Sequence, residues 1–456
     1  MPSNKVVIMG GRVIDPARNI DGPADVLIAT GKVEDVTERP LESAPSGYEV
    51  IDATGLVVAP GFIDLHTHLR EPGLEHKETI ATGASAAARG GFTTVCAMPN
   101  TEPAQDSASV IEDVLRRAAS GAAVRVLPIG AITVGRRGKT LAPLAELAEA
   151  GAVGFSDDGD PVADANIMRQ ALSYAGDLGL PIINHAEDKS LVRGGVMNEG
   201  PVANRLGLAG VPAEAEAVMV ARDIHLAEVT GGRLHIPHVS TRRSVEHVRA
   251  AKARGLNVTA EVTPHHLTLT DAWVYGLHGE TPDSVGLIAY DTNTKVNPPL
   301  RSADDVEAVI EALADGTIDF IATDHAPHAE TDKVCTYAEA AHGINLLETA
   351  FGSVMSLVAD GRIDLVTLIH RLTAAPAAFL GRQMGTLTQG YPADLVLLDP
   401  TAGWEVDTRQ FASRSRNTPL GGVVLRGRVI STIYGGKVVH DIRTETAATA
   451  AGRGKA

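Results

Sequence analysis

The chain has 456 residues, 44% of them hydrophobic, so it is long enough to bury a large core. Its 56 acidic and 40 basic side chains give a formal net charge of −16, which argues against nucleic acid as a partner because phosphate binding needs a basic face. Only two cysteines, no apolar run of about 20 residues and no signal-peptide pattern predict a cytoplasmic chain without a disulfide framework or a membrane span.

The N-terminal segment, residues 1–58, contains short strand-like pieces separated by glycines. Val6–Met9 and Asp25–Ile28 are two of them, and Gly10, Gly11 and Gly31 follow them. Short apolar, β-branched runs between turn residues are typical of strands, so we expect this segment to be β-rich.

The middle of the chain, residues 59–383, alternates apolar runs with Ala-rich, helix-like stretches. The eight strand candidates are Leu56–Asp64, Thr93–Met98, Val124–Ala131, Ala152–Ser156, Pro181–His185, Leu234–Val239, Asn257–Val262 and Asp319–Asp324. Strands alternating with helices indicate parallel βα units, and eight units predict an α/β fold with a closed (β/α)8 barrel.

The C-terminal segment, residues 384–440, returns to the pattern of the N-terminus. Its strand-like pieces include Leu395–Leu398 and Val429–Tyr434. We predict that the two terminal segments pair into one small β-sandwich beside the barrel. The tail, residues 441–456, is rich in Ala, Thr, Gly and charge, and we expect it to be disordered.

The sharpest motif closes the first barrel strand with His66-Thr67-His68. Residues i and i+2 of a strand point to the same side, so His66 and His68 can present two imidazoles to one cation. The C-terminal end of a barrel strand is also where active sites form in this fold. The alternative is a pair of histidines held by ordinary hydrogen bonds.

Other ligand-type residues follow other strands: Asp157 and Asp158 the fourth, His185 the fifth, His238 the sixth and Asp324 the eighth. Each of them alone would be an ordinary cap or loop residue. Together they bring imidazoles and carboxylates, without a thiolate, to one rim. That set suits a catalytic zinc with an open position for water, although manganese or cobalt could also bind.

Several other histidines are interpreted as structural. His265 and His266 are adjacent, and adjacent residues on an extended chain point in opposite directions, so at most one could face the rim. The remaining ones, expected in packing or at the surface, are His225, His235, His247 and His278.

With these motifs the chain resembles the amidohydrolase superfamily, and specifically the bacterial class I dihydroorotases. The general superfamily signatures are Pro60–Asp64 and Gly390–Val396. The more specific motifs are His66–Gly73, Ala97–Thr101, Lys295–Arg301 and Thr323–His328.

The resemblance implies a set of site residues. His66, His68 and Asp324 would hold one Zn²⁺, and His185 and His238 a second, with Asp158 bridging the two; one metal alone is the other option. Asp157 competes with Asp158 for the bridge, and Asp324 would also be the catalytic base and acid. The implied substrate-binding residues are Arg70, Asn100, Asn297, His328, His342 and Gly343. His342 departs from the apolar residue usual in the family.

The activity that the resemblance implies is the reversible cyclisation of N-carbamoyl-L-aspartate to L-dihydroorotate with release of water, the third step of de novo pyrimidine synthesis. A hydantoinase or allantoinase is an alternative, but such relatives bridge their metals with a carboxylated lysine, where this chain has Asp157-Asp158. Further alternatives are an inactive scaffold for aspartate transcarbamoylase and a storage barrel, although all candidate ligands are present. An active enzyme in complex with that transcarbamoylase, or a homo-oligomer, is compatible with the sequence.

Overall fold

A closed barrel of parallel strands forms the centre of the protein, whose computed structural model describes residues 5–281 and 288–444. A three-stranded sheet, β10-β9-β8, and a five-stranded sheet, β11-β12-β15-β16-β17, are joined by parallel bridges between Gly130 and Phe155 and between Thr67 and His325. The predicted (β/α)8 barrel is therefore confirmed. Its strands are β8 (Phe62–Thr67), β9 (Phe92–Ala97), β10 (Arg125–Pro128), β11 (Phe155–Ser156), β12 (Ile182–Ile183), β15 (Leu234–Ile236), β16 (Val258–Val262) and β17 (Phe320–Ile321).

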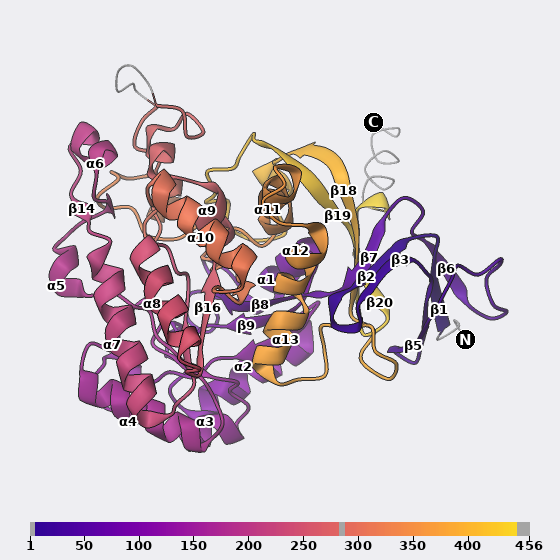
Figure 1. Cartoon of the computed structure of the whole chain (residues 1–456), viewed down its shortest axis with the longest axis horizontal. Coiled ribbons are helices and arrows are strands. Elements are labelled where there is room, and N and C mark those ends of the chain that lie inside the picture. Colours follow the sequence, from indigo (N-terminus) through magenta and orange to yellow (C-terminus); the bar gives the residue numbers. More distant parts are fainter. Residues whose placement is uncertain (1–4, 282–287, 445–456) are drawn as a thin grey trace.

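Helices cover the outside of the barrel (Figure 1). Helix α1 shows how the local sequence starts them: the Thr79 hydroxyl accepts a hydrogen bond from the Thr82 backbone N–H, and the Thr82 hydroxyl accepts one from the Thr79 backbone N–H. The helices are α1 (Ile80–Arg89), α2 (Ala108–Gly121), α3 (Leu144–Glu149), α4 (Ala165–Asp177), α5 (Lys189–Val192), α6 (Pro201–Leu206), α7 (Glu214–Thr230), α8 (Arg242–Ala253), α9 (Pro264–Thr268), α10 (Ala303–Asp315), α11 (Ala350–Ala359), α12 (Leu365–Leu372) and α13 (Ala374–Leu380). A short parallel pair, β13 (Met197–Asn198) and β14 (Gly210–Val211), lies between α5 and α7 in sequence.

The first predicted strand, Leu56–Asp64, is divided in the structure. Its first half is β7 (Val57–Pro60), which pairs with the terminal sheet, and its second half is β8 of the barrel. Gly61 lies at the junction, where a Cβ atom would come within 2.3 Å of the Thr93 side chain. One apolar run thus serves two sheets, which periodicity alone does not reveal.

The two ends of the chain form two further sheets beside the barrel (Figure 1). A six-stranded sheet has the order β20-β19-β18-β7-β2-β3, and a four-stranded sheet the order β5-β4-β1-β6. Apolar side chains of both segments, among them Ile8, Val26 and Leu397, form one buried cluster, as predicted for a sandwich. The strands are β1 (Lys5–Met9), β2 (Arg12–Asp15), β3 (Ile20–Pro23), β4 (Val26–Ala29), β5 (Lys32–Val36), β6 (Glu49–Asp52), β18 (Leu395–Glu405), β19 (Val424–Tyr434) and β20 (Lys437–Asp441).

Of the predicted disordered tail, Asp441 still belongs to β20, and Arg443 donates hydrogen bonds to the Asp441 carboxylate. The rest of that prediction, residues 445–456, lies outside the described residues. Among residues 5–281 and 288–444, no helix is both long and apolar enough to cross a membrane.

Candidate active site

The six predicted metal ligands lie together at the C-terminal rim of the barrel. They are His66 in β8, His68 just after it, Asp158 after β11, His185 after β12, His238 after β15 and Asp324 after β17. None of the six is more than 4% exposed. Because the strands are parallel, their C-terminal ends open on the same side, so residues up to 258 positions apart in the sequence meet there.

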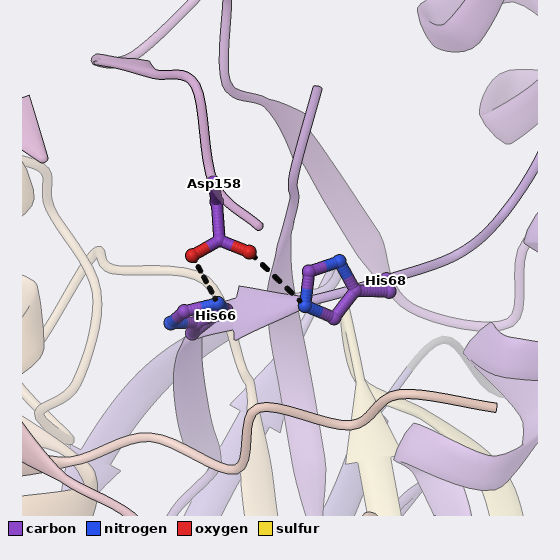
Figure 2. A group of neighbouring side chains, drawn as sticks. All are labelled: His66, His68 and Asp158. Carbon is purple, nitrogen blue, oxygen red and sulfur yellow. Dashed lines mark ion pairs between the residues drawn. The ribbon is translucent and has the colours of Figure 1, made fainter. Parts of the chain in front are cut away.

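Asp158 is the central side chain of this group. Its Oδ1 atom lies 3.4 Å from Nε2 of His66, and its Oδ2 atom lies 3.4 Å from Nε2 of His68, as Figure 2 shows. The same Oδ1 lies 3.7 Å from Nδ1 of His185 and 3.5 Å from Nε2 of His238. One carboxylate therefore faces four imidazoles.

Asp157, the competing candidate for the bridge, turns away from the histidines. Its Oδ1 atom accepts hydrogen bonds from the backbone N–H groups of Ile132 and Thr133, at 2.9 and 3.0 Å, and its Oδ2 atom accepts one from the Thr133 hydroxyl. Burial raises the pKa of Asp157 to about 6. Asp157 thus anchors the neighbouring loop, while Asp158 faces the site.

The side chains fall into two groups that fit metal coordination. His66, His68 and Asp158 form one, and Asp158, His185 and His238 form the other, with the ligand atoms of each group within 4.8 Å of one another. Nε2 of His66 and Oδ1 of Asp158 are buried without a hydrogen bond, although such atoms are normally satisfied. A divalent cation between them would satisfy both.

Asp324 faces the first of these groups. Its Oδ1 atom lies 2.9 Å from Nε2 of His68 and 3.5 Å from Nε2 of His66. Its backbone φ is 50°, and that of His238 is 37°, both in the left-handed region that non-glycine residues rarely adopt. Such strain is typical of functional sites, where the surrounding fold holds a side chain in place.

The charges in this group depend strongly on one another. Burial alone would raise the pKa of the Asp158 carboxyl, but the charge of His66 and the nearby imidazoles of His185 and His238 hold it well below its usual range. Burial would likewise lower the pKa of His66, which the charges of Asp158 and Asp324 raise well above its usual value. A bound dication would replace the protons in this role, because metal ligands must be deprotonated.

A buried carboxylate that the sequence analysis did not identify orients His66. Nδ1 of His66 donates to Oε1 of Glu261 at 2.7 Å, and Nε2 of His235 lies 3.0 Å from the other oxygen of Glu261. Although burial would raise it, the two imidazoles lower the pKa of Glu261 to about 2. His235, expected to be an ordinary packing residue, therefore belongs to the support of the site. The sequence feature that could have identified Glu261 is its position as a charged residue inside the otherwise uncharged strand β16.

His68 is oriented in the same way by Asn100. Nδ1 of His68 donates to Oδ1 of Asn100 at 2.8 Å, so that Nε2 faces Asp158 and Asp324. Metal-binding histidines usually donate their second ring N–H to such a partner, which fixes the tautomer. The amide nitrogen of Asn100 is then the part of its side chain that can serve a substrate.

A cavity of about 180 Å³ opens on these side chains. All the predicted substrate-binding residues line it, together with four of the predicted ligands, His68, Asp158, His185 and Asp324. The full lining is His68, Arg70, Asn100, Asp158, Gly159, His185, Val296, Asn297, Asp324, Ala326, His328, His342 and Gly343. A larger cavity, between the barrel and the C-terminal sheet and lined by Glu348 and Trp404 among others, holds none of them. The chemistry of the residues therefore places the site in the smaller cavity.

Arg70 supplies the positive charge of this cavity. Burial lowers its pKa to about 10, and the charges of Asp324 and Asp158 oppose that shift, so the guanidinium stays charged at neutral pH. Its Nε atom donates to the Pro327 carbonyl at 3.1 Å, and its backbone φ is 62°. A fixed guanidinium suits bidentate binding of a carboxylate.

The remaining predicted substrate residues, Asn297, His328, His342 and Gly343, lie on three connecting segments that line the cavity. Nε2 of His328 lies 2.9 Å from the carbonyl oxygen of His342, and burial together with the charges of Arg70 and Lys333 lowers the pKa of His328 to about 3. The Asn297 amide nitrogen donates to Oε1 of Glu187 at 2.9 Å and lies 3.2 Å from Nε2 of His185.

His265 and His266 lie on the short helix α9 rather than on an extended chain, and both are buried. His266 contacts the Thr263 hydroxyl at 2.8 Å and the Pro298 carbonyl at 3.0 Å. Neither residue belongs to a metal-binding group within the described residues, and the structural role expected for them stays a prediction.

Comparison with known proteins agrees with this geometry. The dihydro-orotase-like family pattern matches residues 55–244, and that of the amidohydrolase family matches residues 238–440. Proteins named dihydroorotase from Anaeromyxobacter dehalogenans and Pelotomaculum thermopropionicum are 52% and 53% identical to this chain. Each match covers 96% of this chain, and 98% and 99% of the respective relative.

Solved structures show the same fold. The L-hydantoinase (dihydropyrimidinase) from Arthrobacter aurescens superposes with a TM-score of 0.83 at 26% identity, covering 96% of each chain. The dihydropyrimidinase from Brevibacillus agri has a TM-score of 0.81 at 25% identity, covering 95% of this chain and 94% of the other. The fold is thus shared with these hydantoinases and dihydropyrimidinases, whereas sequence identity is twice as high with the dihydroorotases. The chain belongs to the dihydroorotase family of the amidohydrolases.

Proposed function

We propose that the protein interconverts N-carbamoyl-L-aspartate and L-dihydroorotate by closing and opening the ring amide. The observation that carries this proposal is a single cavity holding both the carboxylate–imidazole cluster around Asp158 and the buried guanidinium of Arg70. The cluster suits hydrolysis of an amide, and the guanidinium suits a substrate that bears a carboxylate.

We propose two Zn²⁺ ions as the metal cofactor. His66, His68 and Asp324 would hold one ion, His185 and His238 the other, and Asp158 would bridge them. The sharing of Asp158 between two three-residue groups supports this arrangement. Four imidazoles and two carboxylates without a thiolate form a donor set that Zn²⁺ accepts, with room for water.

The chain's own residues would handle the proton. A bound divalent metal supplies a water of lowered pKa and polarises the scissile carbonyl. In the hydrolytic direction, Asp324 takes the proton of the attacking water at a carboxylate oxygen and delivers it to the ring nitrogen as the C–N bond breaks. In the synthetic direction, the carbamoyl nitrogen attacks the protonated carboxyl group, and Asp324 takes the proton of that nitrogen and passes it to the departing hydroxyl, which leaves as water.

The substrate would be held by the polar groups around the cavity. Arg70 would pair with the substrate carboxylate, with Asn100 and His328 beside it, and Asn297 would contact the ureido edge. The backbone of His342 and Gly343 would provide further contacts. All of these residues line the cavity, which supports the proposal.

A hydantoinase-like activity is the competing function, because the hydantoinases share the fold. The test is a comparison of L-dihydroorotate, hydantoin and dihydrouracil as substrates of the purified, zinc-loaded protein. We expect kcat/KM to be highest for L-dihydroorotate, since only this substrate offers a carboxylate to Arg70. A preference for either of the other two would overturn the proposal.

The cytoplasmic location, the homo-oligomer, the complex with aspartate transcarbamoylase and the segment boundaries at 58/59 and 383/384 stay predictions. Strand β7 (Val57–Pro60) spans the first of these boundaries.

A further inference from the structure

We propose that Asn417 is a positioning residue of the substrate pocket, clamping together the two loops that carry His328 and Gly343. Asn417 belongs to the C-terminal segment, and it does not line the cavity. The inference rests on the proposed function only in treating His328 and Gly343 as substrate contacts.

The Asn417 side chain uses both its donors and its acceptor on these loops. Its Nδ2 atom donates to the carbonyl of Ala326 at 3.0 Å and to the carbonyl of Gly343 at 2.9 Å. Its Oδ1 atom accepts from the backbone N–H of His328 at 3.0 Å and also from the Ser415 hydroxyl. At 5% exposure, the amide is shielded from water, so these contacts cannot be replaced freely by solvent.

The two clamped loops form one side of the cavity. Ala326, His328 and Gly343 all line it, and Gly343 packs so closely that a Cβ atom there would come within 2.7 Å of the Ala326 carbonyl oxygen. The carbonyl of Pro327, between Ala326 and His328, accepts the hydrogen bond of Arg70 Nε. A shift of this loop would therefore move both His328 and the partner that orients Arg70.

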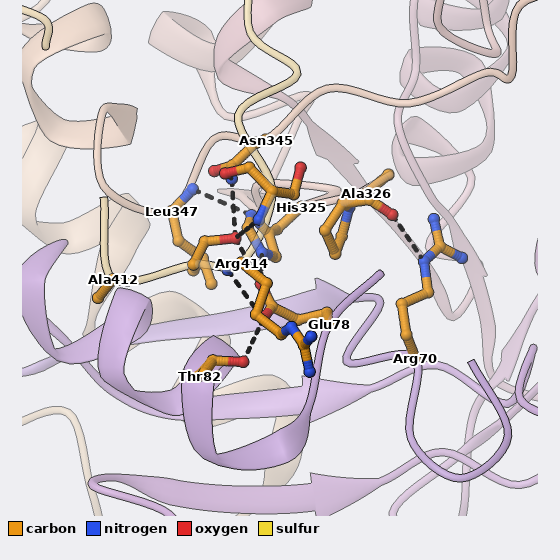
Figure 3. A network of polar contacts seen from close by, with 12 residues as sticks. Arg70, Glu78, Thr82, His325, Ala326, Asn345, Leu347, Ala412 and Arg414 are labelled. Carbon is orange, nitrogen blue, oxygen red and sulfur yellow. Dashed lines mark hydrogen bonds and ion pairs between the residues drawn. The ribbon is translucent and has the colours of Figure 1, made fainter. Parts of the chain in front are cut away.

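The segment that carries Asn417 is itself fixed to the barrel, which a clamp requires. Glu78 accepts hydrogen bonds from the Ser413 hydroxyl and from the backbone N–H of Arg414, and Figure 3 shows Glu78 beside Arg414, Thr82 and His325. The amide of Asn345 donates to the Ser413 hydroxyl at 2.9 Å.

Glu348 accepts from the backbone N–H groups of Ala412 and Ser413 at 3.0 and 3.1 Å. Through these contacts Glu78, Asn345 and Glu348 hold residues 412–414 in place, and the backbone carbonyl of Asn417 accepts a hydrogen bond from the Asn345 N–H at 2.8 Å. His66 and His68 are oriented separately, through Glu261 and Asn100.

Because Asn417 contacts the substrate loops and not the metal ligands, its substitution should change KM more than kcat. Without the clamp, substrate binding must order the loops, which weakens binding, whereas His66 and His68 keep the partners that orient them. Asn417→Ala removes all three contacts with the loops and leaves the His328 N–H only the Ser415 hydroxyl as an acceptor. The nearly isosteric Asn417→Asp keeps an acceptor for the His328 N–H but cannot donate to the two carbonyls. Both variants should raise KM for L-dihydroorotate by roughly tenfold or more, with kcat changed less than about threefold and metal content unchanged.

The matched control is Val26→Ala, which removes buried apolar volume in β4 of the terminal sheets, away from the cavity. It should lower stability without changing KM. A second readout does not depend on activity: amide hydrogen exchange of the metal-loaded protein without substrate. We expect faster exchange in peptides covering 325–329 and 342–346 for both Asn417 variants, and not for Val26→Ala.

Unchanged exchange in these peptides of the Asn417 variants would overturn the clamp. If the wild type hydrolyses L-dihydroorotate, the clamp would also be overturned by variants whose KM is unchanged, or by variants that lose kcat together with the metal. If the wild type does not act on L-dihydroorotate, the proposed function fails, and the exchange comparison alone then decides on the clamp. If Asn417→Ala does not fold, Asn417→Asp carries both readouts.

Discussion

Nδ1 of His66 lies 2.7 Å from Oε1 of Glu261, and this contact sets which nitrogen of the imidazole faces Asp158 and Asp324. Because a carboxylate only accepts, the neutral ring keeps its proton on Nδ1, and the lone pair of Nε2 then points into the site. The relationship joins the first barrel strand to the seventh, and His235 holds Glu261 from the other side.

The first prediction concerns this contact. Glu261→Gln should lower the affinity for the metal by roughly 10–100-fold, the usual cost of losing a partner of a metal-binding histidine. Chelator competition with the purified protein measures this affinity. The control is Asp319→Asn, which alters a carboxylate that bonds Lys252 and the Ala260 backbone N–H instead of a candidate ligand. Equal metal affinity in both variants and the wild type would contradict the role of Glu261.

Arg70 should act mainly in substrate binding. Arg70→Met keeps much of the side-chain volume but loses a charge-assisted pair worth roughly 1.5–3 kcal/mol, so KM should rise by about one to two orders of magnitude. Steady-state kinetics with L-dihydroorotate measure this change, and metal content is the control. An unchanged KM would remove Arg70 from the substrate site.

Asp324 has two proposed tasks, which one substitution can separate. Asp324→Asn still offers a carbonyl oxygen as a ligand but cannot accept a proton near neutral pH. The variant should keep much of its metal and lose on the order of 10²–10⁴-fold in kcat, and the acidic limb of its pH–rate profile should move or vanish. Complete loss of metal would make Asp324 chiefly a ligand. Retained metal with an unchanged pH profile would argue against proton transfer by Asp324.

The stability of the protein should depend on pH through His266. Burial lowers its pKa to about 4 in the folded state, against about 6.5 when unfolded. The unfolded chain therefore binds the proton more readily, so the contribution is complete above pH 6.5 and is lost as the pH falls toward 4. Between pH 7.5 and 5, this one group should lower the free energy of unfolding by about 2 kcal/mol.

Urea denaturation of the metal-free protein at both pH values measures this change. The metal is removed because metal binding itself depends on pH and would add to the measured difference. His266→Gln does not titrate in this range and can still donate to the Pro298 carbonyl. Its loss of stability between the two pH values should be smaller than that of the wild type. Equal losses would show that His266 is not buried in its neutral form.

Much of this site could be predicted from the sequence because strand ends in a parallel barrel converge. The i, i+2 spacing of His66 and His68 and the strand-end positions of His185, His238 and Asp324 are local features, and the barrel brings them together. The choice between Asp157 and Asp158 could not be made, because it depends on which aspartate the N–H groups of Ile132 and Thr133 capture.

The residues that support the site, Glu261 and Asn417, could not be predicted from local sequence patterns, because their partners lie far away in the sequence. Glu261 acts across the barrel, 195 positions from His66, and Asn417 lies 74 positions from Gly343. Neither pair of residues forms a motif of fixed spacing that could be recognised in a single sequence. The division of Leu56–Asp64 at Gly61 was missed because both halves are apolar, and only the pairing partners of β7 and β8 distinguish them.

Removal and return of the metal tests the central claim most directly. The purified protein is stripped with a chelator and reloaded with Zn²⁺, while metal content and hydrolysis of L-dihydroorotate are followed on the same samples. We predict that activity disappears with the metal and returns in proportion to bound zinc, reaching its maximum at two ions per chain. Undiminished hydrolysis of L-dihydroorotate by the metal-free chain, or a fully loaded chain without that activity, would contradict the account.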